Sequence, residues 1–219
     1  MNRVMAMSSC ALVAACAASA SATLVTFTGG TVTRLDSTTQ ITNTTVTWDN
    51  VDYYEEGGYR LDFQPNGGSA GFASHVGSYY GPGNDVIHGH WLTGGLGGLT
   101  TIAITQIAPG TFDLNYFTLT SNTDLGGGPA SGNELAWVRG FNSNVPTGPA
   151  VLLPVGDWGF PGIQIGLGSD FDAVDRVEFY VTNTVVCFGM DDFYINEIPA
   201  PGSVALLGML GGLALRRRR

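Results

Sequence analysis

The stretch RVEFYVTNTVVCFGMDDFYI, residues 176–195, carries the pattern that decides the fold. In its first half, Val177, Phe179 and Val181 alternate with Arg176, Glu178 and Tyr180. A period of two residues is typical of a β-strand that buries one face. A second run of apolar residues extends over 185–195. We therefore predict one strand over 176–181 and another over 185–195.

The same pattern recurs through residues 23–198. Further strands are expected at 24–28, 44–48, 59–63, 72–76, 86–92, 101–107, 112–119, 135–141 and 160–167. Gly-rich turn segments such as GGLGG and LGGGPASG separate them, and no stretch has helical spacing. Ten or eleven short strands without crossover helices predict an all-β fold, an antiparallel β-sandwich of the jelly-roll type. In TFDLNYFTL, the apolar positions change parity near Asn115 and Tyr116, which predicts a β-bulge there.

The charge of the sandwich segment excludes several classes of function. All 18 acidic residues lie within 23–198, together with only four arginines, and the chain has no lysine. The segment therefore carries a formal charge of −14. Binding to nucleic acid needs clustered basic side chains, so we expect no nucleic-acid partner. The absence of lysine also excludes Schiff-base and P-loop chemistry.

The first 22 residues read as a secretory signal peptide. Arg3 precedes an apolar run over 4–18, and small residues then offer cleavage by signal peptidase after Ala20 or Ala22. The alternative is a lipoprotein signal ending at Cys16, because VAAC at 13–16 matches the small-residue pattern before a lipidated cysteine. With cleavage after Ala20 or Ala22, Cys187 is the only cysteine of the mature chain, so no internal disulfide is expected.

The last 21 residues, 199–219, read as a second targeting segment. Pro199-Ala200-Pro201 precedes an apolar segment over 204–215, and Arg216, Arg217, Arg218 and Arg219 end the sequence. Twelve helical residues rise about 18 Å, which is short against a hydrocarbon core of about 30 Å. The arginines are expected to stay cytoplasmic and to place the preceding residues outside. An ordinary tail anchor is the alternative.

This tail resembles the PEP-CTERM sorting signal of Gram-negative bacteria, although Ala200 replaces the central Glu of that motif. The resemblance implies that an exosortase-like membrane enzyme recognises and removes the tail. It also implies transient anchoring in the inner membrane by the C-terminal helix, release to the cell surface or medium, and a link to exopolysaccharide and biofilm matrix. Residues 23–198 also resemble, weakly, the jelly-roll passenger domains that precede such tails.

Aromatic residues in loop-like contexts are candidates for sugar contact, because a flat ring covers the apolar face of a pyranose. Tyr53, Tyr54, Tyr79, Tyr80 and Trp158 have Gly or an acidic residue nearby. Among them Tyr79 and Tyr80, in GSYYGPGND, are the predicted glycan contacts. The competing interpretation of any such ring is packing in the core.

Two segments are candidates for metal ligands. Asp191 and Asp192 suit a structural Ca²⁺, which prefers hard oxygen ligands; the alternative is that such acids only cap loops and solvate the surface. His88-Gly89-His90 places two imidazoles on one face of a strand and suits a transition metal, with Asp85 and His75 as neighbours. A third ligand is not identifiable from the sequence. The alternative is a polar outer strand face with Val86, Ile87 and Trp91 partly buried.

The sequence thus predicts an exported, non-enzymatic envelope or matrix protein that binds polysaccharide. A secreted polysaccharide-degrading enzyme on a lectin-like sandwich is the alternative. Glycoside hydrolysis needs two carboxylates about 5–9.5 Å apart, and Glu55, Glu56, Glu134 and Glu178 are available. A groove with two close carboxylates would favour the enzyme, and a groove of aromatic rings and amides would favour binding.

Overall fold

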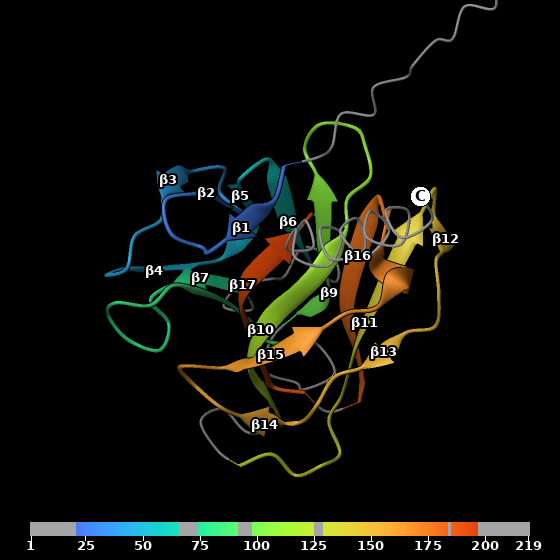
Figure 1. The fold of residues 1–219 in the computed structure, drawn as a ribbon. Coiled ribbons are helices and arrows are strands. Elements are labelled where there is room, and N and C mark those ends of the chain that lie inside the picture. Colours follow the sequence, from blue (N-terminus) through green and yellow to red (C-terminus); the bar gives the residue numbers. More distant parts are fainter. Residues whose placement is uncertain (1–20, 66–73, 92–97, 125–128, 184, 197–219) are drawn as a thin grey trace, which may run out of the picture.

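The computed structural model describes residues 21–65, 74–91, 98–124, 129–183 and 185–196. Over this part of the chain the protein is all-β, with two antiparallel sheets that pack face to face as a sandwich (Figure 1). The prediction of an antiparallel β-sandwich is confirmed. The only helical element among these residues is the short 3₁₀ turn η2, Ser169–Phe171.

The first sheet carries the site described below. Its main path runs β14-β10-β17-β8-β7-β4, while β1 pairs with β17 and β15 pairs with β10. The strands are β1 (Thr23–Val25), β4 (Thr47–Asp49), β7 (Ser74–Gly77), β8 (Val86–Gly89), β10 (Leu114–Thr123), β14 (Gly156–Asp157), β15 (Ile163–Gly166) and β17 (Cys187–Ile195). The two longest strands, β10 and β17, lie side by side at its centre (Figure 1).

The second sheet covers the inner face of the first. Its order is β12-β11-β16-β9-β6-β5-β2-β3, and β13 pairs with β11. The strands are β2 (Thr31–Arg34), β3 (Thr39–Ile41), β5 (Val51–Glu56), β6 (Tyr59–Pro65), β9 (Leu99–Gln106), β11 (Leu135–Asn142), β12 (Val145–Pro146), β13 (Val151–Leu152) and β16 (Arg176–Asn183).

The core lies between the sheets and follows the predicted alternation. On β16, Val177 and Phe179 are buried, and Phe179 packs edge-on against Phe117 of β10 and Phe193 of β17. Ring pairs with this geometry add about 0.5–1.5 kcal/mol each to the burial of their surface. The bulge predicted near Asn115 and Tyr116 is confirmed, because the pairing of β10 with β17 shifts on both sides of Tyr116.

The structure corrects one sequence expectation directly. Tyr53 and Tyr54 do not lie in a loop but in β5, where Tyr54 is fully buried in the core. Its hydroxyl donates to Glu56 and accepts a bond from the Gly30 amide. Burial raises the pKa of Tyr54 strongly, which keeps the hydroxyl protonated.

The predicted signal peptide and the predicted C-terminal sorting tail lie largely outside the described residues. Outside the described residues are the cleavage position Ala20 and, at the other end, Pro199, Ala200, Pro201, Arg216, Arg217, Arg218 and Arg219. Ala22 is described, and it lies exposed directly before β1. In the part of the chain that is described, no helix has the length and hydropathy to cross a membrane.

Candidate functional site

A row of polar residues crosses the outer face of the first sheet. Residues directly opposite each other on antiparallel strands point to the same face. The register places in one such row Asp49, His75, His88, Gly189, Ser121 and Asp157. The neighbouring row of Trp48, Val76, Ile87, Met190 and Leu119 faces the core. The outer face is therefore polar by the same alternation that builds the core.

The connection between β7 and β8 folds back over this row. It leaves β7 at Gly77, whose φ of 116° is favoured by glycine and whose hypothetical Cβ would collide with the Val46 carbonyl. Tyr79 then stacks on His88, with ring centroids 3.9 Å apart and planes inclined by 13°. As a result, His88 is only 1% exposed although it lies on an outer face.

Tyr80 occupies the space above Gly189. A Cβ on Gly189 would lie 2.7 Å from the Tyr80 hydroxyl and 3.0 Å from Ser121 Oγ. The hydroxyl donates to Ser121 Oγ at 2.8 Å and lies 3.3 Å from His88 Nδ1. Because a hydroxyl has one proton to give, Nδ1 of His88 is the donor in the second bond.

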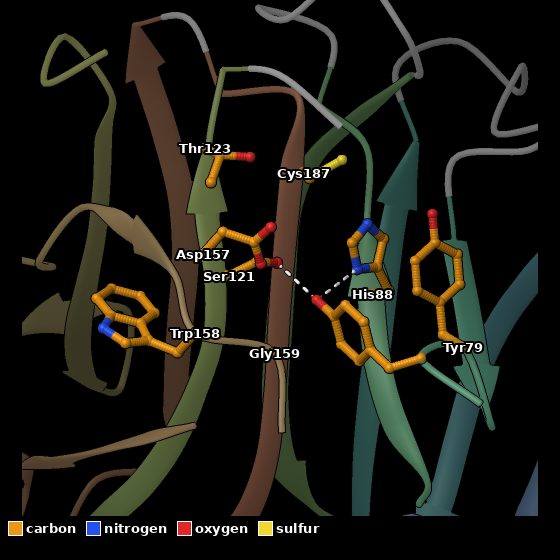
Figure 2. A pocket seen from close by; sticks show the side chains of 9 residues that line it. Tyr79, His88, Ser121, Thr123, Asp157, Trp158, Gly159 and Cys187 are labelled. Carbon is orange, nitrogen blue, oxygen red and sulfur yellow. Dashed lines mark hydrogen bonds between the residues drawn. The ribbon is translucent and has the colours of Figure 1, made fainter. Parts of the chain in front are cut away.

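The segment after β14 forms the opposite wall. The amides of Trp158 and Gly159 both donate to the Thr120 carbonyl on β10 at 3.0 Å, which fixes this segment to the sheet. Trp158 packs partly against the core. Its ring lies across the site from Tyr79 and His88, with Asp157 and Ser121 between them (Figure 2).

These elements enclose a pocket of about 470 Å³. That volume falls within the usual range of small-molecule sites, about 300–1,000 Å³. Its lining is aromatic and polar: Tyr79, Tyr80, His88, Ser121, Thr123, Asp157, Trp158, Gly159 and Cys187 (Figure 2). The two predicted glycan contacts, Tyr79 and Tyr80, both line it, and so does Trp158.

One end of the pocket meets a group that we call the His–Cys cluster, His88, His90 and Cys187. One ligand atom of each residue lies within 4.8 Å of those of the other two, and all three residues are buried. The register explains the cluster, because Gly89 pairs with Phe188 and His90 therefore comes opposite Cys187. The sequence showed the two histidines, but its third member is 97 residues away from His90.

Hydrogen bonds define the tautomers in this cluster. Nδ1 of His90 lies 2.9 Å from the Val186 carbonyl, which only accepts, so Nδ1 carries the proton. Nδ1 of His88 donates to Tyr80, which leaves its Nε2 without a proton. That Nε2 is buried and has no hydrogen-bond partner.

Burial keeps the cluster neutral. Desolvation holds the pKa of His88 well below its usual 6.5, with smaller effects from His90 and His75. The pKa of His90 is lowered mainly by the same cause. Desolvation, followed by the negative charge of Asp157, raises the pKa of Cys187 to about 11. At neutral pH the cluster thus holds two neutral imidazoles and a thiol.

A second group, the acidic cluster of Glu56, Asp85, Asp191 and Asp192, lies where β17 changes partners. β8 pairs with β17 as far as Met190, and β1 pairs with it from Phe193 onward. Asp191 and Asp192 fill the interval, and Asp192 has a φ of 44°. Glu56 accepts bonds there from the amides of Thr26 and Phe27.

Burial, followed by neighbouring carboxylates, raises the pKa of three members of the acidic cluster, Asp85, Asp191 and Asp192. The pKa of Asp191 is raised to about 7, first by burial and then by Asp192, Asp85 and Glu56. Burial and Glu56 also raise the pKa of Asp85 and Asp192. Asp85 is 2% exposed; its Oδ2 accepts from Thr28, whereas its Oδ1 has no partner. Asp85 therefore belongs here and not with the two histidines.

The candidate carboxylates for glycoside hydrolysis have structural partners instead. Glu55 pairs with Arg60 and Glu178 with Arg176. Glu134 accepts from the amides of Asp124, Ser131 and Gly132. None of the four glutamates is among the described residues that line the pocket, where Asp157 supplies the carboxylate.

Comparisons of the chain with protein-family models, with curated proteins and with solved structures found no match.

Proposed function

We propose that the chain is an exported, non-enzymatic envelope or matrix protein whose first sheet binds polysaccharide in the pocket between Tyr79 and Trp158. The observation that carries the proposal is the joint position of Tyr79, Tyr80 and Trp158 around one pocket. These rings come from two connections that are far apart in the sequence. Asp157, Ser121 and Thr123 lie beside them and offer partners to sugar hydroxyls.

The hydrogen-bonding capacity of the pocket also favours a polyhydroxylated ligand. Carboxylate oxygens accept, and hydroxyl side chains both donate and accept, as sugar hydroxyls do. The sandwich segment carries a formal charge of −14. A neutral or cationic glycan is therefore favoured over a strongly anionic one, because like charges repel on approach.

A glycan array with the purified full chain tests the binding proposal. We expect Tyr79→Ala and Trp158→Ala each to raise the dissociation constant for the glycan at least about fivefold. This corresponds to a loss of about 1 kcal/mol of binding free energy. Tyr53→Ala is the matched control, because this partly buried Tyr lies under Arg60 on the second sheet. An array without binding, or an equal loss in the control, would contradict the proposal.

The delivery route is a second part of the proposal. The signal peptide and the PEP-CTERM-like tail support export through signal peptidase and sorting by an exosortase-like enzyme. We expect replacement of Arg216–Arg219 by glutamine to leave the tail unprocessed, as seen in the mass of the mature protein. An unchanged mass and location would refute this route.

The acidic cluster supports a structural Ca²⁺ with Asp191 and Asp192 as ligands. The unpartnered and buried Asp85 Oδ1 fits this proposal, because a buried carboxylate oxygen without a donor is costly. A bound Ca²⁺ would supply the positive charge that these carboxylates lack.

We also propose that the sandwich is a jelly roll, in keeping with the passenger domains that the sequence resembles.

A further inference from the structure

We propose that His88, His90 and Cys187 bind a borderline transition-metal ion such as Zn²⁺, with an open coordination position toward the pocket. This inference is independent of polysaccharide binding, because it concerns the ion alone. Two imidazole nitrogens and one sulfur match the ligand types that Zn²⁺ takes in proteins.

The spacing of the three side chains is close to that of a metal site. Zn–N bonds of about 2.0–2.1 Å and a Zn–S bond of about 2.3 Å place the ligand atoms of a tetrahedral site roughly 3.4–3.6 Å apart. The three ligand atoms already lie within 4.8 Å of one another. Cys187 Sγ lies 3.9 Å from Nδ1 of His90, so closure of the site requires the side chains to reorient and to move closer together. His88 lies on β8, His90 follows that strand directly and Cys187 begins β17, so the register of these two neighbouring strands fixes their approach.

One ring nitrogen of His88 lacks a hydrogen-bond partner. Nε2 of His88 is buried without a partner, and such a group typically costs about 1–3 kcal/mol. Its proton sits on Nδ1, bonded to Tyr80, so the lone pair of Nε2 is available to a cation. Figure 2 shows this second ring nitrogen directed to the side of the ring where the Cys187 sulfur lies.

Hydrogen-bond acceptors surround the two histidines. Protein ligands to metals usually donate their other ring N–H to a carbonyl, a carboxylate or another acceptor. His90 does so to the Val186 carbonyl, and His88 does so to the Tyr80 hydroxyl. Asp157 adds a negative charge to the same pocket, which favours a bound cation.

The open position follows from the pocket lining. His88 and Cys187 line the pocket. An ion bound between them would face the pocket on one side, where it could accept a water molecule or an oxygen of a ligand. Three protein ligands with an open position are typical of zinc sites that bind exchangeable ligands.

Titration with the metal alone tests the inference. The purified full chain carries Cys10→Ser and Cys16→Ser so that Cys187 is its only thiol. We expect one equivalent of Co²⁺ to produce a thiolate-to-cobalt charge-transfer band, and Zn²⁺ to displace Co²⁺ and remove the band. Cys187→Ser should abolish the band. His90→Gln should weaken binding about 100-fold, while Tyr53→Ala, on the second sheet and outside the pocket, should leave both band and affinity unchanged.

The absence of a band at one equivalent would overturn the inference, and so would a band that survives Cys187→Ser. If Cys187→Ser does not fold, as judged by circular dichroism, the affinity of His90→Gln decides. An affinity equal to that of the parent chain then refutes the assignment. Because no glycan is present, failure here leaves the polysaccharide proposal intact, and an empty glycan array leaves this inference intact.

Discussion

The acidic cluster and the His–Cys cluster both include residues of β17, yet burial acts on them with different chemical results. In the acidic cluster, burial raises the pKa of Asp85, Asp191 and Asp192 and so favours bound protons. In the His–Cys cluster, it lowers the pKa of His88 and His90 and so removes protons.

Burial therefore leaves the two clusters in different protonation states before a cation binds. Neutral imidazoles already present lone pairs, so only the thiol of Cys187 must lose a proton to bind a metal. The carboxyl of Asp191 must first be deprotonated against its raised pKa. Hard oxygen ligands prefer Ca²⁺, whereas nitrogen and sulfur prefer Zn²⁺. The clusters should therefore respond to different ions.

Crossed variants should give the largest effect. At a free-ion concentration 100 times the dissociation constant, each ion should raise the free energy of unfolding by about 2.7 kcal/mol. Cys187→Ser should remove the response to Zn²⁺ and keep that to Ca²⁺, and Asp191→Asn should do the reverse. Thermal melts with and without chelator measure both. A variant that loses both responses would show that the clusters are not separate sites.

Gly189→Ala should have the next largest effect. Its Cβ would collide with Thr120 Oγ1 and lie 2.7 Å from the Tyr80 hydroxyl, so the Thr120 side chain and the Tyr80 ring must both shift. Overpacking of this kind costs typically about 1–3 kcal/mol, which urea unfolding measures. Gly166→Ala is the control, because no atom lies within 4 Å of its hypothetical Cβ. Equal stability of the two variants would contradict the close approach over Gly189.

The free energy of unfolding should depend on pH because Asp191 of the acidic cluster has a raised pKa. The pKa of Asp191 is about 7 in the folded chain and 3.8 as its ordinary value, so the folded state binds more protons between these values. Its contribution to stability is complete below about pH 4 and is lost as pH rises toward 7. The slope from this group is at most about 1.4 kcal/mol per pH unit.

Added Ca²⁺ sharpens this measurement. If Ca²⁺ binds the ionised Asp191, it should stabilise the chain most near pH 8 and least near pH 5. Urea unfolding over this range, with Asp191→Asn as the control, measures the difference. A Ca²⁺ effect that is equal at both pH values, or equal in the control, would exclude Asp191 as a ligand.

The fold class was predictable because the alternation of buried and exposed residues can be recognised within each single strand. The alternation in 176–181 survives in β16, where Val177 and Phe179 are buried. β5 escaped prediction because its buried residues, Val51 and Tyr54, are three apart. A register shift against β2 accompanies this spacing and hides the period of two.

The site was predictable only in its local parts. Tyr79 and Tyr80 stood out because Gly residues flank them, and His88 and His90 because they are two residues apart. Cys187 did not stand out, because only the register between β8 and β17 brings it to His90. Nor does the sequence tell which cluster Asp85 joins, since its hydrogen bond to Thr28 spans 57 residues.

X-ray absorption at the zinc K edge tests the central claim. This claim is that the outer face of the first sheet carries a preformed ligand-binding site, with His88, His90 and Cys187 at one end. For the full chain with Cys10→Ser and Cys16→Ser, loaded with one equivalent of Zn²⁺, we predict one sulfur at about 2.3 Å and nitrogen ligands at about 2.0–2.1 Å. A first shell of oxygen and nitrogen alone, without sulfur, would contradict the claim.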